Sequence, residues 1–135
     1  MVKNFFVCGI MGWIIEIFWT GFCSLCKRDP CLKSTTSLWM LPIYGVAAFF
    51  TPVFGFLSGL SLLAKSIFYP LTIFTVEFLT GATLRKITGK CPWDYSSSKY
   101  NVKGLIRLDY WPLWFIVGII FESAFKYFGK KTLTD

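Results

Sequence analysis

The sequence predicts an all-α, polytopic membrane protein: four transmembrane helices in one bundle, forming a single domain over residues 1–135. Of its 135 residues, 55% are hydrophobic and only 16% are charged, and the mean hydropathy is +0.58. A small domain in water has proportionally more surface to cover with polar groups, so this composition fits a bilayer better than water. Apolar runs of about 20 residues, the length that crosses a ~30 Å hydrocarbon core, recur along the chain. No room remains for a separate soluble catalytic domain.

The first predicted span covers residues 5–26, an apolar run that ends at the polar segment 27–30. A cleaved signal peptide is the alternative, because Lys3 precedes the run. The run is longer than the apolar region of a signal peptide, and it lacks a small-x-small cleavage site. The sequence therefore favours a first transmembrane helix.

The second and third predicted spans cover residues 42–64 and 66–84, and Lys65 separates them. The second contains two prolines. Pro42 suits the first turn of a helix, where an N–H would have no partner, and Pro52 predicts a kink.

The fourth predicted span covers residues 110–128, after a polar loop at 85–109. Four spans place both termini on one side of the membrane. Of the 14 Lys and Arg residues, five lie with the termini and nine with the two loops on the other side. The positive-inside rule then predicts termini on the non-cytoplasmic side, although the basic C-terminal tail opposes this orientation. The five are Lys3, Lys65, Lys126, Lys130 and Lys131; the nine are Lys27, Arg28, Lys33, Arg85, Lys86, Lys90, Lys99, Lys103 and Arg107.

Three carboxylates, Glu16, Glu77 and Glu122, lie inside apolar spans, where an ionised side chain costs at least a few kcal/mol. Each has a glycine one helical turn away, on the same helix face. Small residues let helices approach closely in lipid, so we expect the three carboxyls to face the bundle interior and to converge in one site. The opposing interpretation is structural: protonated carboxyls that hydrogen-bond between helices. The glycines are Gly12, Gly81 and Gly118.

Lys126 follows Glu122 by one turn and is predicted to pair with it. The loop after the third span contains a run from Cys91 to Ser96, rich in aromatic side chains. Trp and Tyr favour the headgroup region, which makes this run an interfacial anchor. The alternative is a gate that folds over the mouth of the bundle. Its residues would be Arg85, Trp93, Asp94, Tyr95 and Asn101.

Metal and cofactor sites are not predicted. Histidine is absent, and the single CxxC, Cys23 with Cys26, lacks a second pair of ligands. Cytoplasmic loops would keep the thiols reduced, whereas the opposite orientation permits a bridge from Cys26 or Cys31 to Cys91. The net charge of +7 is explained by orientation and anionic headgroups, so no nucleic-acid partner is expected.

A succession of motifs resembles the ABC-transporter type IV (CmpB-like) family, and within it the small four-pass transmembrane protein 229 subgroup. The resemblance covers nearly the whole chain and implies a small four-pass membrane protein. The chain departs from bacterial members, which carry an Asn-Arg-Gly where residues 34–37 are found here. The motifs are Gly12-Trp13 with Glu16, Pro42-Ile43-Tyr44-Gly45, Glu77-Phe78 with Thr80-Gly81, and Pro92-Trp93-Asp94-Tyr95-Ser96.

The leading functional hypothesis is a transporter or channel-like protein, acting as a homo-oligomer in the bilayer, that binds a proton, cation or small solute. Its pathway would consist of Glu16, Glu77, Glu122 and Tyr44, with Gly12, Gly45, Gly81 and Gly118 packing the helices. The alternative is a non-transporting accessory subunit of a larger membrane complex. An intramembrane lipid enzyme with Glu77 or Asp94 as base ranks last, because no nucleophile lies beside a base.

Overall fold

The computed structural model describes residues 2–132, with the side chains of all of them except 51, 54 and 128–132. The chain divides into two compact units, Met1–Thr51 and Pro52–Asp135. Each unit is described by itself. The predicted single bundle concerns the assembly of the two units and stays a prediction.

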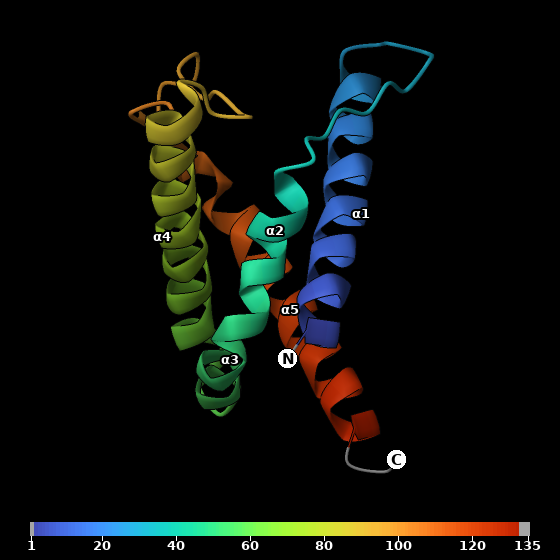
Figure 1. Cartoon of the computed structure of the whole chain (residues 1–135), viewed down its shortest axis with the longest axis vertical. Coiled ribbons are helices and arrows are strands. Elements are labelled where there is room, and N and C mark those ends of the chain that lie inside the picture. The colour runs from blue at the N-terminus through green and yellow to red at the C-terminus, as the bar shows by residue number, and fades with distance from the viewer. Residues whose placement is uncertain (1, 133–135) are drawn as a thin grey trace. The chain divides into compact units, whose positions relative to one another are not determined.

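The first unit contains one long helix and a segment that returns along it. Helix α1 spans Val2–Cys26, and the return consists of an extended stretch, helix α2 (Met40–Gly45) and the 3₁₀ helix η1 (Val46–Phe50) (Figure 1). The order of contacts shows an antiparallel return: Ser34 lies against Gly21 near the end of α1, and Gly45 lies against Phe5 near its start. Phe5 and Gly21 are 16 positions apart on α1, about 24 Å of helix.

The backbone of the extended part of the return forms hydrogen bonds with side chains of α1. The indole N–H of Trp13 donates to the carbonyl of Ser37 over 2.9 Å, and the hydroxyl of Thr20 accepts from the N–H of Thr35 over 3.2 Å. Non-helical backbone is tolerated at membrane depth only where protein or water satisfies it. Helix α1 therefore supplies partners that a neighbouring strand would otherwise supply.

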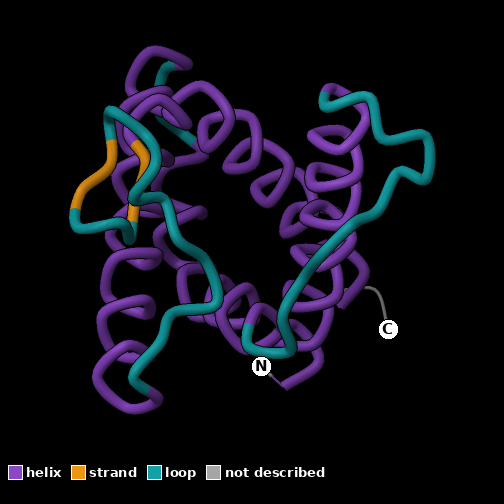
Figure 2. Tube along the Cα trace, turned by 90° about the horizontal axis from the view of Figure 1, so that it is seen from above, coloured by secondary structure: helices purple, strands orange, loops and turns teal. Residues whose placement is uncertain are grey.

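The second unit contains helix α3 (Thr51–Ser58) and two long helices, α4 (Leu62–Thr88) and α5 (Trp111–Thr132). Helix α4 begins where the hydroxyl of Ser61 accepts from the N–H of Ala64, and it ends at the left-handed Gly89. The loop between α4 and α5 is folded. It contains a β-hairpin whose two strands, β1 (Asn101–Val102) and β2 (Ile106–Arg107), are two residues long each. A 3₁₀ turn, η2 (Leu108–Tyr110), follows (Figure 2).

Helices α4 and α5 pack in antiparallel fashion. Tyr69 of α4 lies against Gly118 of α5, where a Cβ atom would come within 2.5 Å of the Tyr69 Cβ. Pro70 lies inside α4 and cannot donate to the carbonyl of Ser66. The indole N–H of Trp111 donates to that carbonyl over 2.8 Å, so α5 satisfies the acceptor that the proline leaves open.

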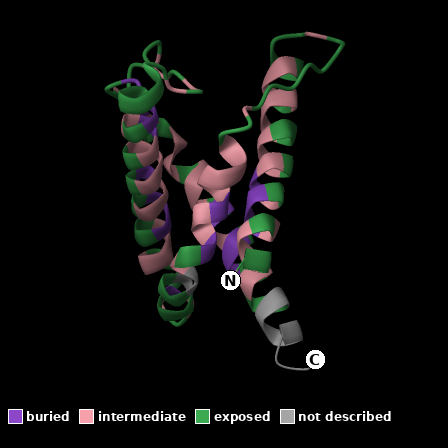
Figure 3. Cartoon of the chain, in the orientation of Figure 1, coloured by how far each residue is buried: buried purple, intermediate pink, exposed green. Residues whose placement is uncertain are grey.

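Large apolar side chains are exposed at helical spacing. On α1 they form a stripe at intervals of three and four residues (Figure 3). In water such a stripe would be buried, whereas lipid covers it without a partner. Among the described residues, three helices are long and apolar enough to span a membrane: Val2–Cys26, Leu62–Thr88 and Leu108–Tyr127. This is an integral, multi-pass membrane protein. The α1 stripe consists of Val2, Phe6, Ile10, Ile14, Phe18, Phe22 and Leu25.

The predicted second span, 42–64, differs most from the structure. The chain there forms α2, η1 and α3 in succession, and α3 ends at Ser58. The third helix begins at Leu62 instead of Ser66, because Ser61 caps it and a charge such as Lys65 does not interrupt a helix. Pro42 lies in the first turn of α2 as expected. At Pro52 the chain does not kink one helix but passes from η1 into α3.

Candidate functional site

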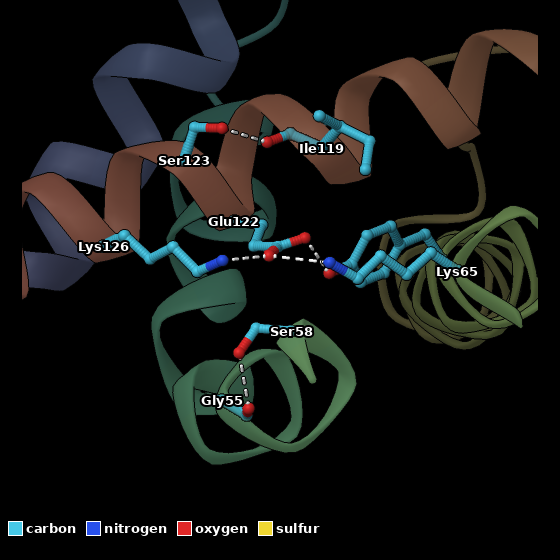
Figure 4. A network of polar contacts seen from close by, with 8 residues as sticks. Gly55, Ser58, Lys65, Ile119, Glu122, Ser123 and Lys126 are labelled. Carbon is cyan, nitrogen blue, oxygen red and sulfur yellow. Dashed lines mark hydrogen bonds and ion pairs between the residues drawn. The ribbon is translucent and has the colours of Figure 1, made fainter. Parts of the chain in front are cut away.

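The two glutamates of the second unit have different surroundings. Glu122 of α5 is buried and lies between two ammonium groups (Figure 4). Its Oε1 accepts from Lys65 Nζ over 3.0 Å and from Lys126 Nζ over 2.5 Å, and its Oε2 accepts from the Tyr69 hydroxyl over 2.5 Å. The Lys65 side chain is only 12% exposed, whereas that of Lys126 is 56% exposed. Both oxygens of Glu122 are therefore satisfied within the chain.

Glu77 of α4 has no such compensation. Its Oε1 accepts from the hydroxyl of Tyr95, which comes from the loop, over 3.0 Å. The indole of Trp114 lies beside the same carboxyl. Glu77 Oε2 and Trp114 Nε1 are both buried, and neither has a hydrogen bond of good geometry among the described residues, although the indole acts on the carboxyl as a donor. Among the side chains that the structure describes, no ammonium or guanidinium group forms an ion pair with Glu77.

The two carboxyls lie at different depths. Glu77 is eight residues from Tyr69 on α4, and Trp114 is eight residues from Glu122 on α5. Both counts give roughly 12 Å along the helix axes. Buried Phe74 and Val117 belong to the stretches between them. Glu77 and Glu122 are therefore staggered along this helix pair.

The loop that brings Tyr95 to Glu77 packs on the last turns of α4. The side chains of Leu105 and Trp93 lie against Gly81 and leave no room for a Cβ atom there. Such an atom would lie 2.9 Å from Leu105 Cδ2 and 3.0 Å from Trp93 Cζ2. The Trp93 indole N–H donates to the Leu105 carbonyl over 2.8 Å. Arg85 donates to the carbonyl of Lys103 over 3.0 Å, which ties the hairpin to the helix end.

Asp94 and Asn101 organise the loop internally. Asp94 accepts from the N–H and the hydroxyl of Ser96 over 2.9 and 2.6 Å, and these hydrogen bonds hold the pKa of Asp94 below its ordinary value. Asn101 donates to the carbonyl of Ser98 over 2.6 Å and accepts from the N–H of Gly104 over 2.9 Å. Gly104 has a φ of 69°, a conformation that favours glycine.

An aromatic row extends from Tyr95 toward α5. The Tyr95 ring contacts Tyr110 edge to face at 5.8 Å, and Tyr110 contacts Trp114 at 6.0 Å. Arg107 lies over Tyr110 at 4.5 Å and is paired with Asp109 over 2.7 Å. The guanidinium that approaches this row is thus neutralised by its own carboxylate.

In the first unit, Glu16 of α1 accepts from the hydroxyl of Thr36 over 3.1 Å and receives a hydrogen bond from Tyr44. The Tyr44 ring occupies the space that a Cβ at Gly12 would need. Gly45 is required for a similar reason, because a Cβ there would lie 2.6 Å from Phe5 Cε2. The Tyr-Gly pair of α2 therefore fits against the Gly12–Glu16 face of α1.

The sequence singled out Glu16, Glu77, Glu122, Tyr44 and Tyr95 as candidate site residues, and the predicted ion pair of Lys126 with Glu122 is present. It missed the second lysine, Lys65, and the donor Tyr69. Their spacing could have indicated a shared partner, since Lys65 and Tyr69 are four residues apart and lie on one helix face. It also missed Trp114 and Thr36, which only the tertiary contacts reveal. Whether Glu16 meets the other two carboxyls depends on the assembly of the two units, and it stays a prediction.

No group of three or more Asp, Glu, Cys or His side chains that could hold a metal ion occurs within the part of the chain that the structure describes. All five cysteines are free thiols, and burial raises the pKa of the Cys91 thiol.

No solved structure matches this chain. A family model described as "Putative ABC-transporter type IV" matches residues 3–134. The match covers nearly the whole sequence, including α1, both carboxyls of the second unit and the folded loop. The chain therefore belongs to this family of membrane proteins.

Proposed function

We propose that this protein is a small transporter or channel-like membrane protein that binds and exchanges a proton or a small cation at an intramembrane carboxylate. Glu77 is the exchanging group. The observation that carries the proposal is the difference between the two glutamates of the second unit: Glu122 has two ammonium partners, and Glu77 has none among the described residues.

The physical argument concerns charge in a low-dielectric medium. An ionised carboxylate inside a membrane costs several kcal/mol unless a counter-charge or water compensates it. Two neutral donors near Glu77, one of them without a completed hydrogen bond, do not supply a positive charge. A proton or a small cation supplies that charge. Glu122 needs neither, because its own chain compensates it.

The loop supports a route to this carboxyl. Tyr95 is the side chain from outside the long helices that reaches Glu77, and the loop that carries it is held by hydrogen bonds within itself. In this proposal the loop acts as the gate, with Arg85, Trp93, Asp94 and Asn101 fixing its position. Tyr95 is the group that moves when Glu77 exchanges its ligand.

The remaining parts of the proposal extend to the assembled protein. Glu16, with Tyr44, forms a further station of the pathway, and a homo-oligomer encloses it. The termini lie on the non-cytoplasmic side, as the distribution of Lys and Arg favours. The small four-pass transmembrane protein 229 subgroup is the proposed place of the chain within its family.

An accessory subunit of a larger membrane complex is the second candidate. The observation in its favour is Glu122, whose ion pairs join α4 to α5 as structural contacts would. Under this alternative Glu77 is also structural, and its replacement by glutamine changes no flux.

The test is ion flux into proteoliposomes that hold purified protein, with a pH-sensitive dye and a cation-sensitive dye inside. Wild type is compared with Glu77→Gln, Glu16→Gln and Glu122→Gln. Asp29→Asn, which removes a carboxylate that the proposed pathway does not use, is the control at matched incorporation. We expect flux in wild type and Asp29→Asn and its loss in Glu77→Gln. Absence of flux in wild type, or full flux in Glu77→Gln, would contradict the proposal.

A further inference from the structure

We infer that the species exchanged at Glu77 is a proton and not a metal cation. This inference rests on the proposed function, because it takes Glu77 as the exchanging group and names its ligand. The argument uses the chemical character of the groups that face the carboxyl.

The groups directed at Glu77 are hydrogen-bond donors. Tyr95 donates its hydroxyl proton to Oε1, and Trp114 has an indole N–H, which can only donate. Trp114 interacts with the Glu77 carboxyl as a donor, but neither its buried Nε1 nor the buried Glu77 Oε2 has a hydrogen bond of good geometry among the described residues. A species that completes both contacts donates to Oε2 and accepts from Nε1. Water has this character, and a water molecule there can carry a proton to and from the carboxyl.

A metal cation requires groups that offer lone pairs, and not hydrogen-bond donors. Alkali, alkaline-earth and similar hard cations take several oxygen ligands, and an indole N–H, which can only donate a hydrogen bond, cannot be one of their ligands. Glu77 offers one free carboxylate oxygen. Asp94, which acts on the same Cys91 thiol as Glu77, uses its carboxylate for Ser96. No group of three or more metal-binding side chains occurs among the side chains that the structure describes. The donor set fits proton exchange and does not fit a dehydrated metal ion.

The other titratable or charged groups near Glu77 do not change this conclusion. Cys91 contributes a neutral thiol from the loop, and Tyr95 and Tyr110 contribute phenols. Arg107 lies over the Tyr110 ring and is already bound by Asp109. On α5, Glu122 lies roughly 12 Å away along the axis and has its own lysines.

The sequence permits a direct experiment, because it contains only three glutamates. Protein labelled with ¹³C at the glutamate side-chain carboxyl, in lipid nanodiscs, gives one signal per glutamate by NMR. Glu16→Gln, Glu77→Gln and Glu122→Gln assign the three signals. Each signal is then followed with pH, and at fixed pH with KCl, NaCl, MgCl₂ and CaCl₂ at constant ionic strength.

We expect the Glu77 signal to titrate with pH and to stay in place when one cation replaces another. Trp114→Phe, which removes the N–H and keeps an aromatic ring, should shift the Glu77 midpoint and leave the Glu122 signal unchanged. A Glu77 signal that moves with one cation at fixed pH would overturn the inference. So would a signal that is insensitive to pH while the protein stays folded. Because this readout needs no flux, a protein that titrates without transporting would refute the proposed transport and leave the ligand assignment intact.

Discussion

Glu77 of α4 and Glu122 of α5 belong to one pair of packed helices, yet only Glu122 has positively charged partners among the described residues. Glu122 draws two lysines and a tyrosine from α4 and α5, whereas Glu77 draws a tyrosine from a loop and a tryptophan whose N–H has no hydrogen bond of good geometry among the described residues. Two acidic residues in similar apolar sequence thus have different surroundings. The counter-charges of Glu122 join α4 to α5, and the proposed function takes Glu77, which has none among the described residues, as the group that binds a ligand.

The largest effect is expected at Glu122. In Glu122→Gln the Lys65 ammonium, only 12% exposed, loses its carboxylate, and leaving a buried charge unpaired costs about 3–5 kcal/mol. We expect a clear fall in the midpoint of thermal unfolding, followed by tryptophan fluorescence in detergent. Glu77→Gln should change it little, because no ammonium partner loses its carboxylate.

The double variant Lys65→Met/Glu122→Gln is the control for this first prediction. Removing both charges leaves no buried ion, so the double variant should regain most of the stability that Glu122→Gln loses. An equal fall in the unfolding midpoint for Glu77→Gln and Glu122→Gln would contradict the prediction that the two carboxyls differ in their contribution to stability.

The next effect concerns the glycines beside each carboxyl. In Gly118→Ala the new methyl group would meet the Cβ of Tyr69, an atom that moves only with the α4 backbone. Overpacking of this kind costs about 1–3 kcal/mol. Gly81→Ala should cost less, since its neighbours are the outer atoms of Leu105 and Trp93. The same unfolding measurement ranks the two variants, and a larger loss in Gly81→Ala would contradict the prediction.

A smaller effect is expected at Tyr95. Tyr95→Phe removes the hydroxyl that donates to Glu77 and keeps the ring, and one hydrogen bond contributes about 1 kcal/mol. Hydrogen exchange should show faster exchange in residues 89–110 and unchanged exchange around Glu122. Tyr100→Phe, an exposed tyrosine in the same loop, is the matched control and should leave exchange unaltered.

The smallest effect is a pH dependence of the loop. Ser96 holds the pKa of Asp94 below its ordinary value, so this contact stabilises the loop above about pH 4 and is lost as pH falls through the lowered pKa. The amide NMR signal of Ser96 should therefore move at low pH in wild type and stay in place in Asp94→Asn. Asp94 is exposed, and its loss should not disturb Glu122.

Much of the architecture followed from composition and periodicity. The three long helices correspond to apolar runs bounded by charges, and Lys126 was placed beside Glu122 by its spacing alone. The region 42–64 was less predictable. Its mean apolarity resembles a span, but Pro52 and the Ser61 cap divide it, and a hydropathy average does not register such local stops.

The sequence by itself determined the solvent, the long helices and the presence of three carboxylates in apolar surroundings, because these depend on composition and on distances of one or two turns. Only the tertiary structure decided which carboxyl is compensated. Lys65 is 57 residues from Glu122, and Tyr95 is 18 from Glu77. Hydrogen bonds act over about 3 Å, so such partners are identified by how the helices and the loop pack and not by their positions in the sequence.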